Sequence, residues 1–295
     1  NGKVIVCSNS SSINITIPDT LTSGFGCTIV QSGSGQVTVA TSGSATIFGY
    51  GGNLSTAGQY ASLNIIPTGS NAYLVEGELG AGPFSNNFSL ELDGGDDYAT
   101  IGTTYSALSG NKSISGWFYF DSVATRSIFA PVGASGFSSQ GWFILNASSI
   151  RFKAGSTLHT FTVPTLSTGA WYHLAVTGDG TDLKLYINGT QQGGDKADGD
   201  WSIGEFFRTS NFYYFDGKVD EIGLWTGNTL SSSDVLAIAN VAAASGDKAV
   251  DLTAYTGLTH WWRFGDGDTS PTVSDTVGGN DMTLINGPTF VSQVP

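Results

Sequence analysis

The sequence predicts an all-β protein with one short helix, divided into a small N-terminal module and a larger C-terminal sandwich. Only 12% of the residues are charged, while 40% are hydrophobic and 12% aromatic, which excludes disorder over most of the length. The chain has 41 glycines and many Ser and Thr residues, a composition that suits short strands joined by tight turns. Apolar and polar residues alternate in most segments, with the period of a β-strand.

A Gly- and Pro-rich segment at residues 80–83 divides the chain, because neither a strand nor a helix is expected to run through it. We therefore expect one domain at residues 1–82 and a second at 86–292. A domain of about 80 residues buries only about 60–65% of its surface and is marginal alone, so copies or neighbouring domains are expected to complete it. Its expected strands are residues 3–7, 12–17, 27–31, 37–39, 45–48, 61–66 and 73–75.

The two cysteines, Cys7 and Cys27, lie in strand-like segments of the N-terminal module. Two cysteines in a chain of this length are not a disulfide framework. A bond between them stays open as an alternative, with free, half-buried thiols the favoured state. The three histidines, at positions 159, 173 and 260, do not have the spacing of a metal site.

The charge of the chain excludes two classes of partner. The formal net charge is −13, with only 11 Lys and Arg residues, so no cationic cluster is present for a nucleic-acid backbone. An anionic membrane would repel such a chain, and no apolar run approaches the ~20 residues of a membrane span. The chain begins at Asn1 and shows nothing that resembles a signal peptide, so we expect a processed or partial product of a longer protein.

Strand signals continue through the C-terminal part and are interrupted by one helical segment. Residues 230–240 combine a serine N-cap with apolar residues at helical spacing, which predicts a short helix over one end of the sandwich. The dipeptide Asn188-Gly189 predicts a type I′ hairpin turn. Three tryptophans in the middle of strand-like segments are expected in the core, namely Trp117, Trp171 and Trp262.

Three segments carry a family resemblance. They are SLELDGGDDYATIG (residues 89–102), SISGWFYFDS (113–122) with GAWYHLAVTGDGTDLKLYINGTQQGG (169–194), and FDGKVDEIGLWTGNTLSSSDVLAIAN (215–240). In this order they resemble the laminin-G-like, concanavalin A-like jelly-roll family over residues 88–240, and the resemblance extends through 258–290. It implies a jelly-roll β-sandwich. Members serve as lectins, adhesion modules or spacers, so the fold alone does not give the function.

The N-terminal module carries a second resemblance. Residues 12–79 contain, in order, a strand with a Pro turn, Ile-Val-Gln, Gly-Gln-Val-Thr, Gly-Gln-Tyr-Ala and Tyr-Leu-Val-x-Gly. This order is similar to a β-module of bacteriophage tail and fibre proteins. The resemblance implies a virion component on the particle surface that contacts other virion proteins and assembles with itself, most often as a homotrimer.

Acidic residues form the candidate metal site. Asp93, Asp96 and Asp97 cluster on one Gly-rich turn, and Ca²⁺ takes about six to eight oxygen ligands. Many relatives of this fold bind Ca²⁺ near a loop rim, where Asp220 or Glu221 could complete the set. The alternative is that these aspartates face solvent and close Asx-turns. A second acidic turn, at residues 266–268, has fewer carboxylates.

Aromatic residues form the candidate carbohydrate site. Sugars stack their apolar faces on aromatic rings, and a few polar groups fix their orientation. Residues 201–214 are crowded with aromatics, and successive strand residues face opposite sides, so some of them must point away from the core. The candidates are Trp201, Phe212, Tyr213 and Tyr214. The alternative is that these rings pack against the helix, a loop or a neighbouring subunit.

A catalytic role is not expected. Residues Glu91, Asp93 and Asp96 come close to the E-x-D-x-x-E pattern of a glycosidase family with this sandwich, but Gly94-Gly95 should turn the chain before the third carboxylate. No Gly-x-Ser-x-Gly elbow or P-loop is present. We therefore do not expect an enzyme. Taken together, the two resemblances imply a bacteriophage virion protein whose jelly roll is displayed outward and binds host surface glycan. A capsid or tail decoration protein without glycan binding and a secreted bacterial adhesin are the alternatives.

Overall fold

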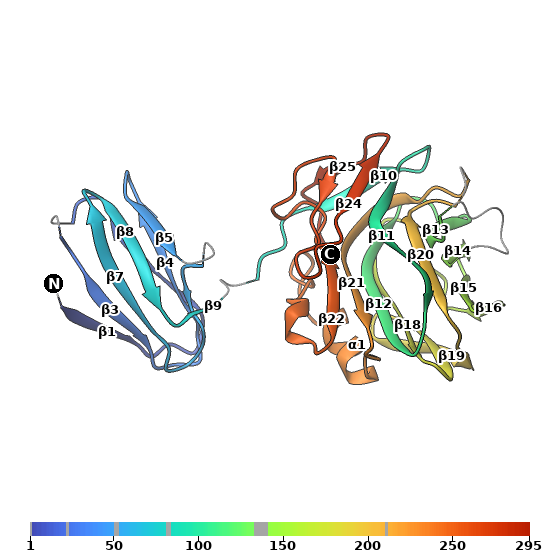
Figure 1. The fold of residues 1–295 in the computed structure, drawn as a ribbon, viewed down its shortest axis with the longest axis horizontal. Helices are drawn as coiled ribbons and strands as arrows, with labels where there is room; N and C mark the ends of the chain where they lie inside the picture. Colours follow the sequence, from blue (N-terminus) through green and yellow to red (C-terminus); the bar gives the residue numbers. More distant parts are fainter. Residues whose placement is uncertain (1, 22–23, 50–52, 81–83, 133–140, 210–211) are drawn as a thin grey trace. The chain divides into compact units, whose positions relative to one another are not determined.

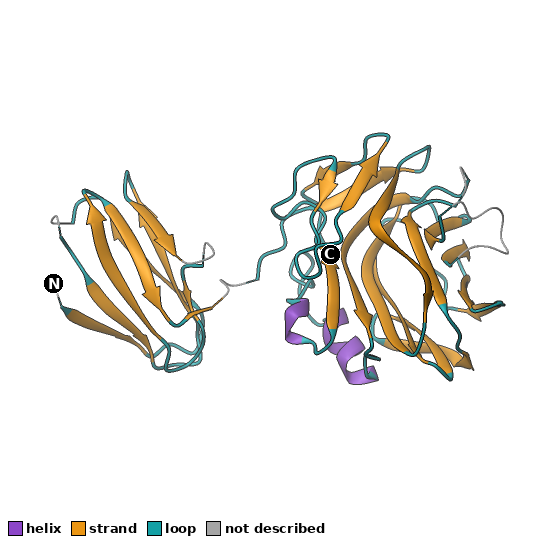
Figure 2. Ribbon diagram, viewed as in Figure 1, coloured by secondary structure: helices purple, strands orange, loops and turns teal. Residues whose placement is uncertain are grey.

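The computed structural model describes residues 2–21, 24–49, 53–80, 84–132, 141–209 and 212–295. Contacts divide the chain into two compact units, Asn1–Ser85 and Asn86–Pro295. Residues 81–83 of the Gly- and Pro-rich segment lie outside the described residues. The predicted all-β class is confirmed: strands form most of both units, and the described residues contain a single α-helix, α1 (Ser232–Ala239), and a short 3₁₀ turn, η3 (Leu252–Ala254) (Figures 1 and 2).

The N-terminal unit is built from two sheets. Their buried faces enclose a small core of Ile, Val, Leu, Tyr and Cys side chains. The first sheet has the strand order β1 (Lys3–Cys7), β3 (Cys27–Gln31), β7 (Ser62–Gly69), β8 (Ala72–Gly77) and β5 (Thr46–Gly49). The second has the order β2 (Ile13–Pro18), β4 (Val37–Ser42), β6 (Ser55–Thr56) and β9 (Leu79–Gly80).

In this unit β1 pairs in parallel with β3, and β2 pairs in parallel with β4. Lys3 lies opposite Cys27 and Ile13 lies opposite Val37, so in both sheets the partner is 24 residues further along the chain. The turn between β1 and β2 therefore lies against the turn between β3 and β4. A Cβ atom at Gly35 would come within 2.0 Å of the Ser11 carbonyl oxygen, which is why this turn needs glycine. Strands β1 and β2 form the outermost layer of the stack.

The register also settles the state of the cysteines. Cys7 lies opposite Gln31, four residues along β3 from Cys27, which places the two Cα atoms about 13 Å apart along the strand. A disulfide needs Cα atoms within about 7 Å, so this pair cannot form one. Both thiols are free, as expected from the sequence, but they are buried and not half-buried, and burial raises the pKa of each.

The C-terminal unit is a sandwich of two antiparallel sheets, in which the spatial order of the strands differs from their order in the sequence (Figure 1). The first, called sheet C here, has the order β19 (Thr190–Ala197), β18 (Asp182–Ile187), β17 (Trp171–Asp179), β12 (Asn111–Phe120), β21 (Asp216–Thr226), β10 (Ser89–Asp93) and β25 (Thr289–Val291), with β22 (Leu258–Trp262) also paired to β21. The second, sheet D, has the order β16 (Thr157–Thr162), β15 (Ser149–Ala154), β14 (Trp142–Asn146), β13 (Arg126–Ala130), β20 (Trp201–Phe206), β11 (Tyr98–Leu108), β24 (Met282–Ile285) and β23 (Thr272–Val273).

The main core lies between these sheets and is rich in aromatic rings. Alternate residues of each strand enter it, so Leu174 and Val176 of β17 are buried there while His173 and Ala175 lie on the other face of sheet C. Of the three tryptophans expected in the core, Trp262 is in this cluster.

The outer face of sheet C is covered in part by α1 and the segments around it. Trp117 is 2% exposed on this face, and Lys248 lies 5.8 Å from its ring centroid. Leu236 of α1 packs over Gly189 of the β18–β19 turn. Trp117 is buried as expected, but in this outer layer and not in the main core. Trp171 is only partly buried, so its expected place in the core is wrong.

Two local predictions are confirmed. Asn188 and Gly189 have φ values of 49° and 77°, as a type I′ turn requires. The helix α1 is capped by Ser231, whose hydroxyl accepts from the Asp234 amide while the Asp234 carboxylate accepts from the Ser231 amide. Among the described residues there is no helix whose length and apolarity would let it span a bilayer.

Candidate ligand-binding rim

Four chain reversals meet at one end of the sandwich, which is the upper end of the C-terminal unit in Figure 1. They join β10 to β11, β12 to β13, β20 to β21, and β24 to β25. Asn286 donates to the Asp96 carbonyl oxygen at 2.9 Å, and Arg126 pairs with Asp216 at 3.1 Å, so these turns are in direct contact. We call this end the rim.

The acidic turn of the rim gathers the carboxylates that the sequence predicts. Asp93, Asp96 and Asp97 each offer an oxygen, and these oxygens lie within 4.8 Å of one another. The turn is closed by Asp93, which accepts from the Gly95 amide at 2.7 Å, and by Asp97, which accepts from the Asp93 amide at 3.1 Å. Burial raises the pKa of Asp97, and the carboxylates of Asp93 and Asp96 raise it further. A bound cation would relieve this repulsion.

Beside this turn lies a cavity of about 380 Å³ with three further carboxylates, from Glu91, Asp121 and Asp216. Two cations pair with these carboxylates. Lys218 is 3.1 Å from Glu91 and 3.4 Å from Asp121, and Arg126 pairs with Asp216. Burial lowers the pKa of Lys218, but these carboxylates outweigh it and hold the pKa above its ordinary value. The cavity therefore presents carboxylate oxygens to a ligand, with its cations already paired.

The aromatic loop between β20 and β21 is the second component of the rim. Phe212 is 67% exposed, and Tyr213 and Tyr214 are half-buried. Phe212 and Tyr213 lie 6.4 Å apart between ring centroids. The loop is anchored at Tyr213, whose carbonyl oxygen accepts from the Ser127 amide at 2.7 Å. Residues 210–211 of the loop lie outside the described residues.

Arg208 connects the aromatic loop to the acidic turn. Its guanidinium lies 3.3 Å from the ring centroid of Tyr98, the residue that directly follows Asp97. The same guanidinium makes two hydrogen bonds to the Glu205 carboxylate and also bonds Tyr214. The structure thus brings together two groups of residues that lie more than a hundred positions apart in the sequence.

Two of the predicted site residues are not part of the rim. Trp201 is fully buried in the main core, because it points inward from β20 and its indole N–H donates to Asp198 at 3.0 Å. Its ring cannot stack on a sugar, so the prediction of Trp201 as a carbohydrate-binding residue is wrong.

Asp220 is also fully buried, and it accepts from Asn86 at 2.8 Å. It lies four residues along β21 from Asp216, or about 13 Å from the rim. Burial raises its pKa, and the adjacent Glu221 raises it further. The expectation that Asp220 joins the acidic turn is therefore wrong. Its place is taken by Asp216, which lies directly opposite Asp93 in the β10–β21 pair.

The second acidic turn has a structural role. Asp266 accepts from the Asn87 amide at 3.0 Å and lies 3.6 Å from Arg263. Asp268 accepts from the amides of Gly265 and Ser274 at 2.9 and 2.8 Å. These carboxylates hold the C-terminal segment together.

Residues 93–236 match the laminin G-type model of the concanavalin A-like lectin/glucanases superfamily. No curated protein sequence matches the chain. A Bacteroides ovatus protein to which carbohydrate binding is attributed has 15% identity and a TM-score of 0.53, with 97% of each chain covered. At this identity the likeness shows a shared fold and nothing more.

Two further solved structures share less with the chain. A heptameric SAP-like pentraxin from Limulus polyphemus has 10% identity and a TM-score of 0.49, over 70% of this chain and 96% of that one. The CBM40 of a Ruminococcus gnavus sialidase, bound to α2,3-sialyllactose, has 16% identity and a TM-score of 0.37, over 51% and 96%. With the family match and the observed sandwich taken together, residues 93–236 form a concanavalin A-like domain of the laminin G type.

Proposed function

We propose that the C-terminal unit binds host surface glycan at the rim. The observation that carries this proposal is that an exposed aromatic loop and a carboxylate-lined cavity lie at the same end of the sandwich. Arg208 links them, because it lies on the ring of Tyr98, next to the cavity residue Asp97. Phe212 offers a ring to the apolar face of a sugar, and the carboxylates of the cavity offer acceptors for its hydroxyls. The match of residues 93–236 to a lectin superfamily supports this function.

We further propose that the rim binds Ca²⁺. The chemistry of the donors fits this ion, because Asp93, Asp96 and Asp97 present clustered carboxylate oxygens and Ca²⁺ prefers oxygen ligands. Asp121 and Asp216 line the adjoining cavity and could supply further oxygens. When bound, the ion would neutralise the repulsion that raises the pKa of Asp97.

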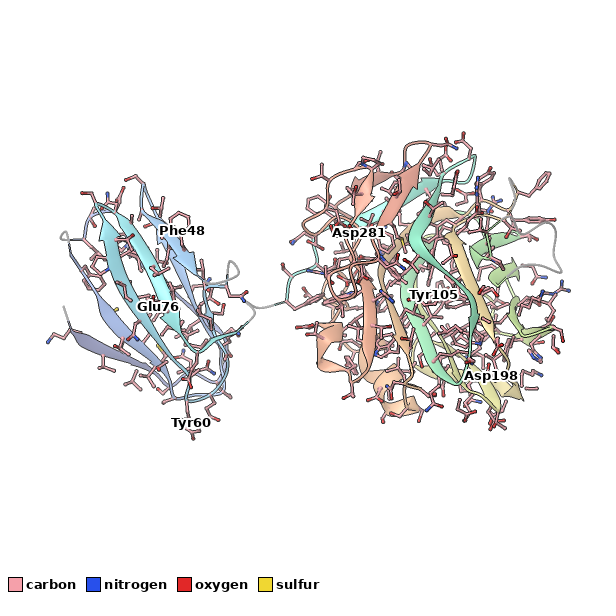
Figure 3. The ribbon with its side chains drawn as sticks, in the orientation of Figure 1. Phe48, Tyr60, Glu76, Tyr105, Asp198 and Asp281 are labelled. Atoms are coloured by element: carbon pink, nitrogen blue, oxygen red, sulfur yellow. The ribbon has the colours of Figure 1, made fainter. Side chains whose placement is uncertain are left out.

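The test is saturable binding of the full chain to isolated host envelope and to a glycan array, with and without EDTA. Phe212→Ala is expected to reduce affinity about two- to tenfold, since an aromatic contact contributes about 0.5–1.5 kcal/mol. Phe48→Ala is the matched control, because Phe48 is 64% exposed but belongs to the N-terminal unit (Figure 3). Equal loss in both variants, or no binding by the unmodified chain, would remove the rim as a glycan site.

Binding measured with EDTA tests whether a cation contributes to glycan binding. If Ca²⁺ is part of the site, EDTA weakens glycan binding and Asp93→Asn reproduces that effect without EDTA. If binding is unchanged by both, the acidic turn holds no cation that matters for the glycan. Absence of all binding would instead favour the alternative of a capsid or tail decoration protein.

For the N-terminal unit we propose an assembly role in a bacteriophage virion, as a homotrimer on the particle surface that contacts other virion proteins. The specific support is its outermost layer. Strand β1 lies at the edge of its sheet with Val4 and Val6 61% and 62% exposed, and β2 lies at the edge of the other sheet. Exposed apolar edge strands favour pairing with another chain. A secreted adhesin remains the competing source of such a module.

Sedimentation of the full chain tests this role. A trimer is expected, and Val4→Lys with Val6→Lys should shift it to monomer, because lysines at a sheet edge oppose pairing. Ile66→Lys, at an exposed position inside the same sheet, is the control and should leave the trimer intact. A monomer at all concentrations would contradict the assembly role and leave the glycan proposal untouched.

A further inference from the structure

A second cavity, of about 260 Å³, lies on the outer face of sheet C, between β17, β18, β19 and the segment that leads into α1. It shares no lining residue with the rim cavity. Strand β17 begins at the rim with Trp171 and ends at the second cavity with Asp179, about 26 Å further along the strand. Figure 3 labels Asp198, which accepts from the neighbouring Gly180 amide, at the lower end of the unit, opposite the rim.

Alternation along the strands decides which side chains face this cavity. Leu183 and Leu185 of β18 enter the main core, so Lys184 and Tyr186 face outward. Thr177 lies opposite Lys184 in β17, and Gln191 lies opposite Tyr186 in β19. These outward residues line the cavity.

Two hydroxyl groups at the wall of this cavity have no partner within the protein. Tyr186 is 3% exposed and Thr177 is 2% exposed, and neither side-chain hydroxyl forms a hydrogen bond within the part of the chain that the structure describes. Neither oxygen is among the described side-chain atoms that are both fully buried and unpartnered, so each keeps a small contact with solvent in the cavity. Both hydroxyls are therefore free to donate to, or accept from, a molecule that enters the cavity.

The charges around the cavity limit what this molecule can be. Asp179 and Asp182 both line it, and the Asp182 carboxylate has no hydrogen-bond partner among the described residues. Lys184 also lines the cavity, but it is already paired with Asp195, a residue outside the lining, at 3.6 Å. The start of α1 offers no free anion site, since its cap is closed by the Asp234 carboxylate. An anion would be repelled, whereas a neutral molecule with several hydroxyls could donate to Asp182.

We propose that this cavity is a second carbohydrate site that takes one neutral sugar residue. The Tyr186 and Thr177 hydroxyls bond the sugar hydroxyls, and the Asp182 carboxylate accepts from them. A volume of about 260 Å³ is just below the roughly 300–1,000 Å³ of sites for drug-sized ligands, which suits one monosaccharide. The site does not depend on glycan binding at the rim.

The test is calorimetric titration of the full chain with glucose, galactose, mannose and N-acetylglucosamine, in a Phe212→Ala background that weakens the rim. At least one sugar is expected to bind with a dissociation constant on the order of 1 mM, since a ligand of this size gains little free energy per atom. Tyr186→Phe and Thr177→Val should each weaken it about fivefold, as expected for one lost hydrogen bond.

Both substitutions remove only an unpartnered hydroxyl, so the unfolding midpoint should not fall. Tyr60→Phe, at an exposed tyrosine of the N-terminal unit, is the matched control and should leave the affinity unchanged. The proposal is overturned if none of the four sugars binds, or if binding is the same with and without the Tyr186 and Thr177 hydroxyls. Because the rim is weakened in every sample, neither outcome bears on glycan binding at the rim.

Discussion

Acidification should destabilise the C-terminal unit through one histidine. His173 is 1% exposed on the outer face of sheet C, and neither ring nitrogen has a hydrogen-bond partner among the described residues. Trp117 packs on its ring at 5.3 Å between centroids. Burial without a counter-charge lowers the pKa of His173 from 6.5 to about 3. The folded protein therefore holds this imidazole neutral throughout the mildly acidic range.

The direction and the size of this change in folding stability follow from proton linkage. Between pH 6.5 and about 3 the unfolded chain binds a proton at position 173 and the folded chain does not, so the stability present above pH 6.5 is lost as the pH falls. At pH 4.5 the loss is about two pH units at 1.36 kcal/mol each, or about 3 kcal/mol. His173→Leu removes this contribution. At pH 7 the two proteins should differ by less than about 1.5 kcal/mol, because the side chains have similar volume.

Urea unfolding followed by tryptophan fluorescence measures this directly, because all seven tryptophans lie in the C-terminal unit. The free energy of unfolding is compared between the original chain and His173→Leu at pH 7, 5.5 and 4.5. Contributions from Asp97, Asp275 and the other carboxylates are common to both proteins and cancel in the difference. A difference that stays constant from pH 7 to 4.5 would refute the reasoning.

Three further results are expected. Lys112→Met should lower the free energy of unfolding, measured by urea titration, by about 3–5 kcal/mol. Lys112 and Asp198 form a fully buried ion pair at 2.7 Å, and the substitution would leave the buried Asp198 carboxylate without its counter-charge. Ser231→Ala should cost about 1 kcal/mol in the same assay through loss of the α1 cap. Cys7 and Cys27 should react with a thiol reagent only in denaturant, and mass spectrometry should then detect two modified thiols.

The strands and the helix could be predicted because their signals are local. The alternation of Leu183, Leu185 and Ile187 sets one face of β18, the Asn188-Gly189 pair sets its turn, and Ser231 caps α1, each within a few residues. The members of the acidic turn were predictable for the same reason, since Asp93 to Asp97 are neighbours in the sequence.

The rest of the rim depends on register between distant strands. Asp216 reaches Asp93 because β10 and β21 pair antiparallel from those two residues, and a shift of four positions would have placed Asp220 there instead. Trp201 faces the core because β20 is a central strand whose inner positions are fixed by its partners β11 and β13. The sequence between 201 and 214 contains the aromatics but not the side of the strand on which each lies.

The two cavities lie at opposite ends of β17, and that arrangement constrains any ligand that uses both. The span between Trp171 and Asp179 is about 26 Å, and α1 and the segment before it cover part of the outer face, where Leu236 lies over Gly189 and Leu230 is buried. A monosaccharide held at Phe212 cannot reach Tyr186, which lies opposite Ala175 and therefore about 13 Å along β17 from Trp171. Loss of either site should therefore leave the affinity of the other unchanged for short sugars. Only a long or densely branched glycan surface, engaged by both ends at once, would gain in avidity from the pair.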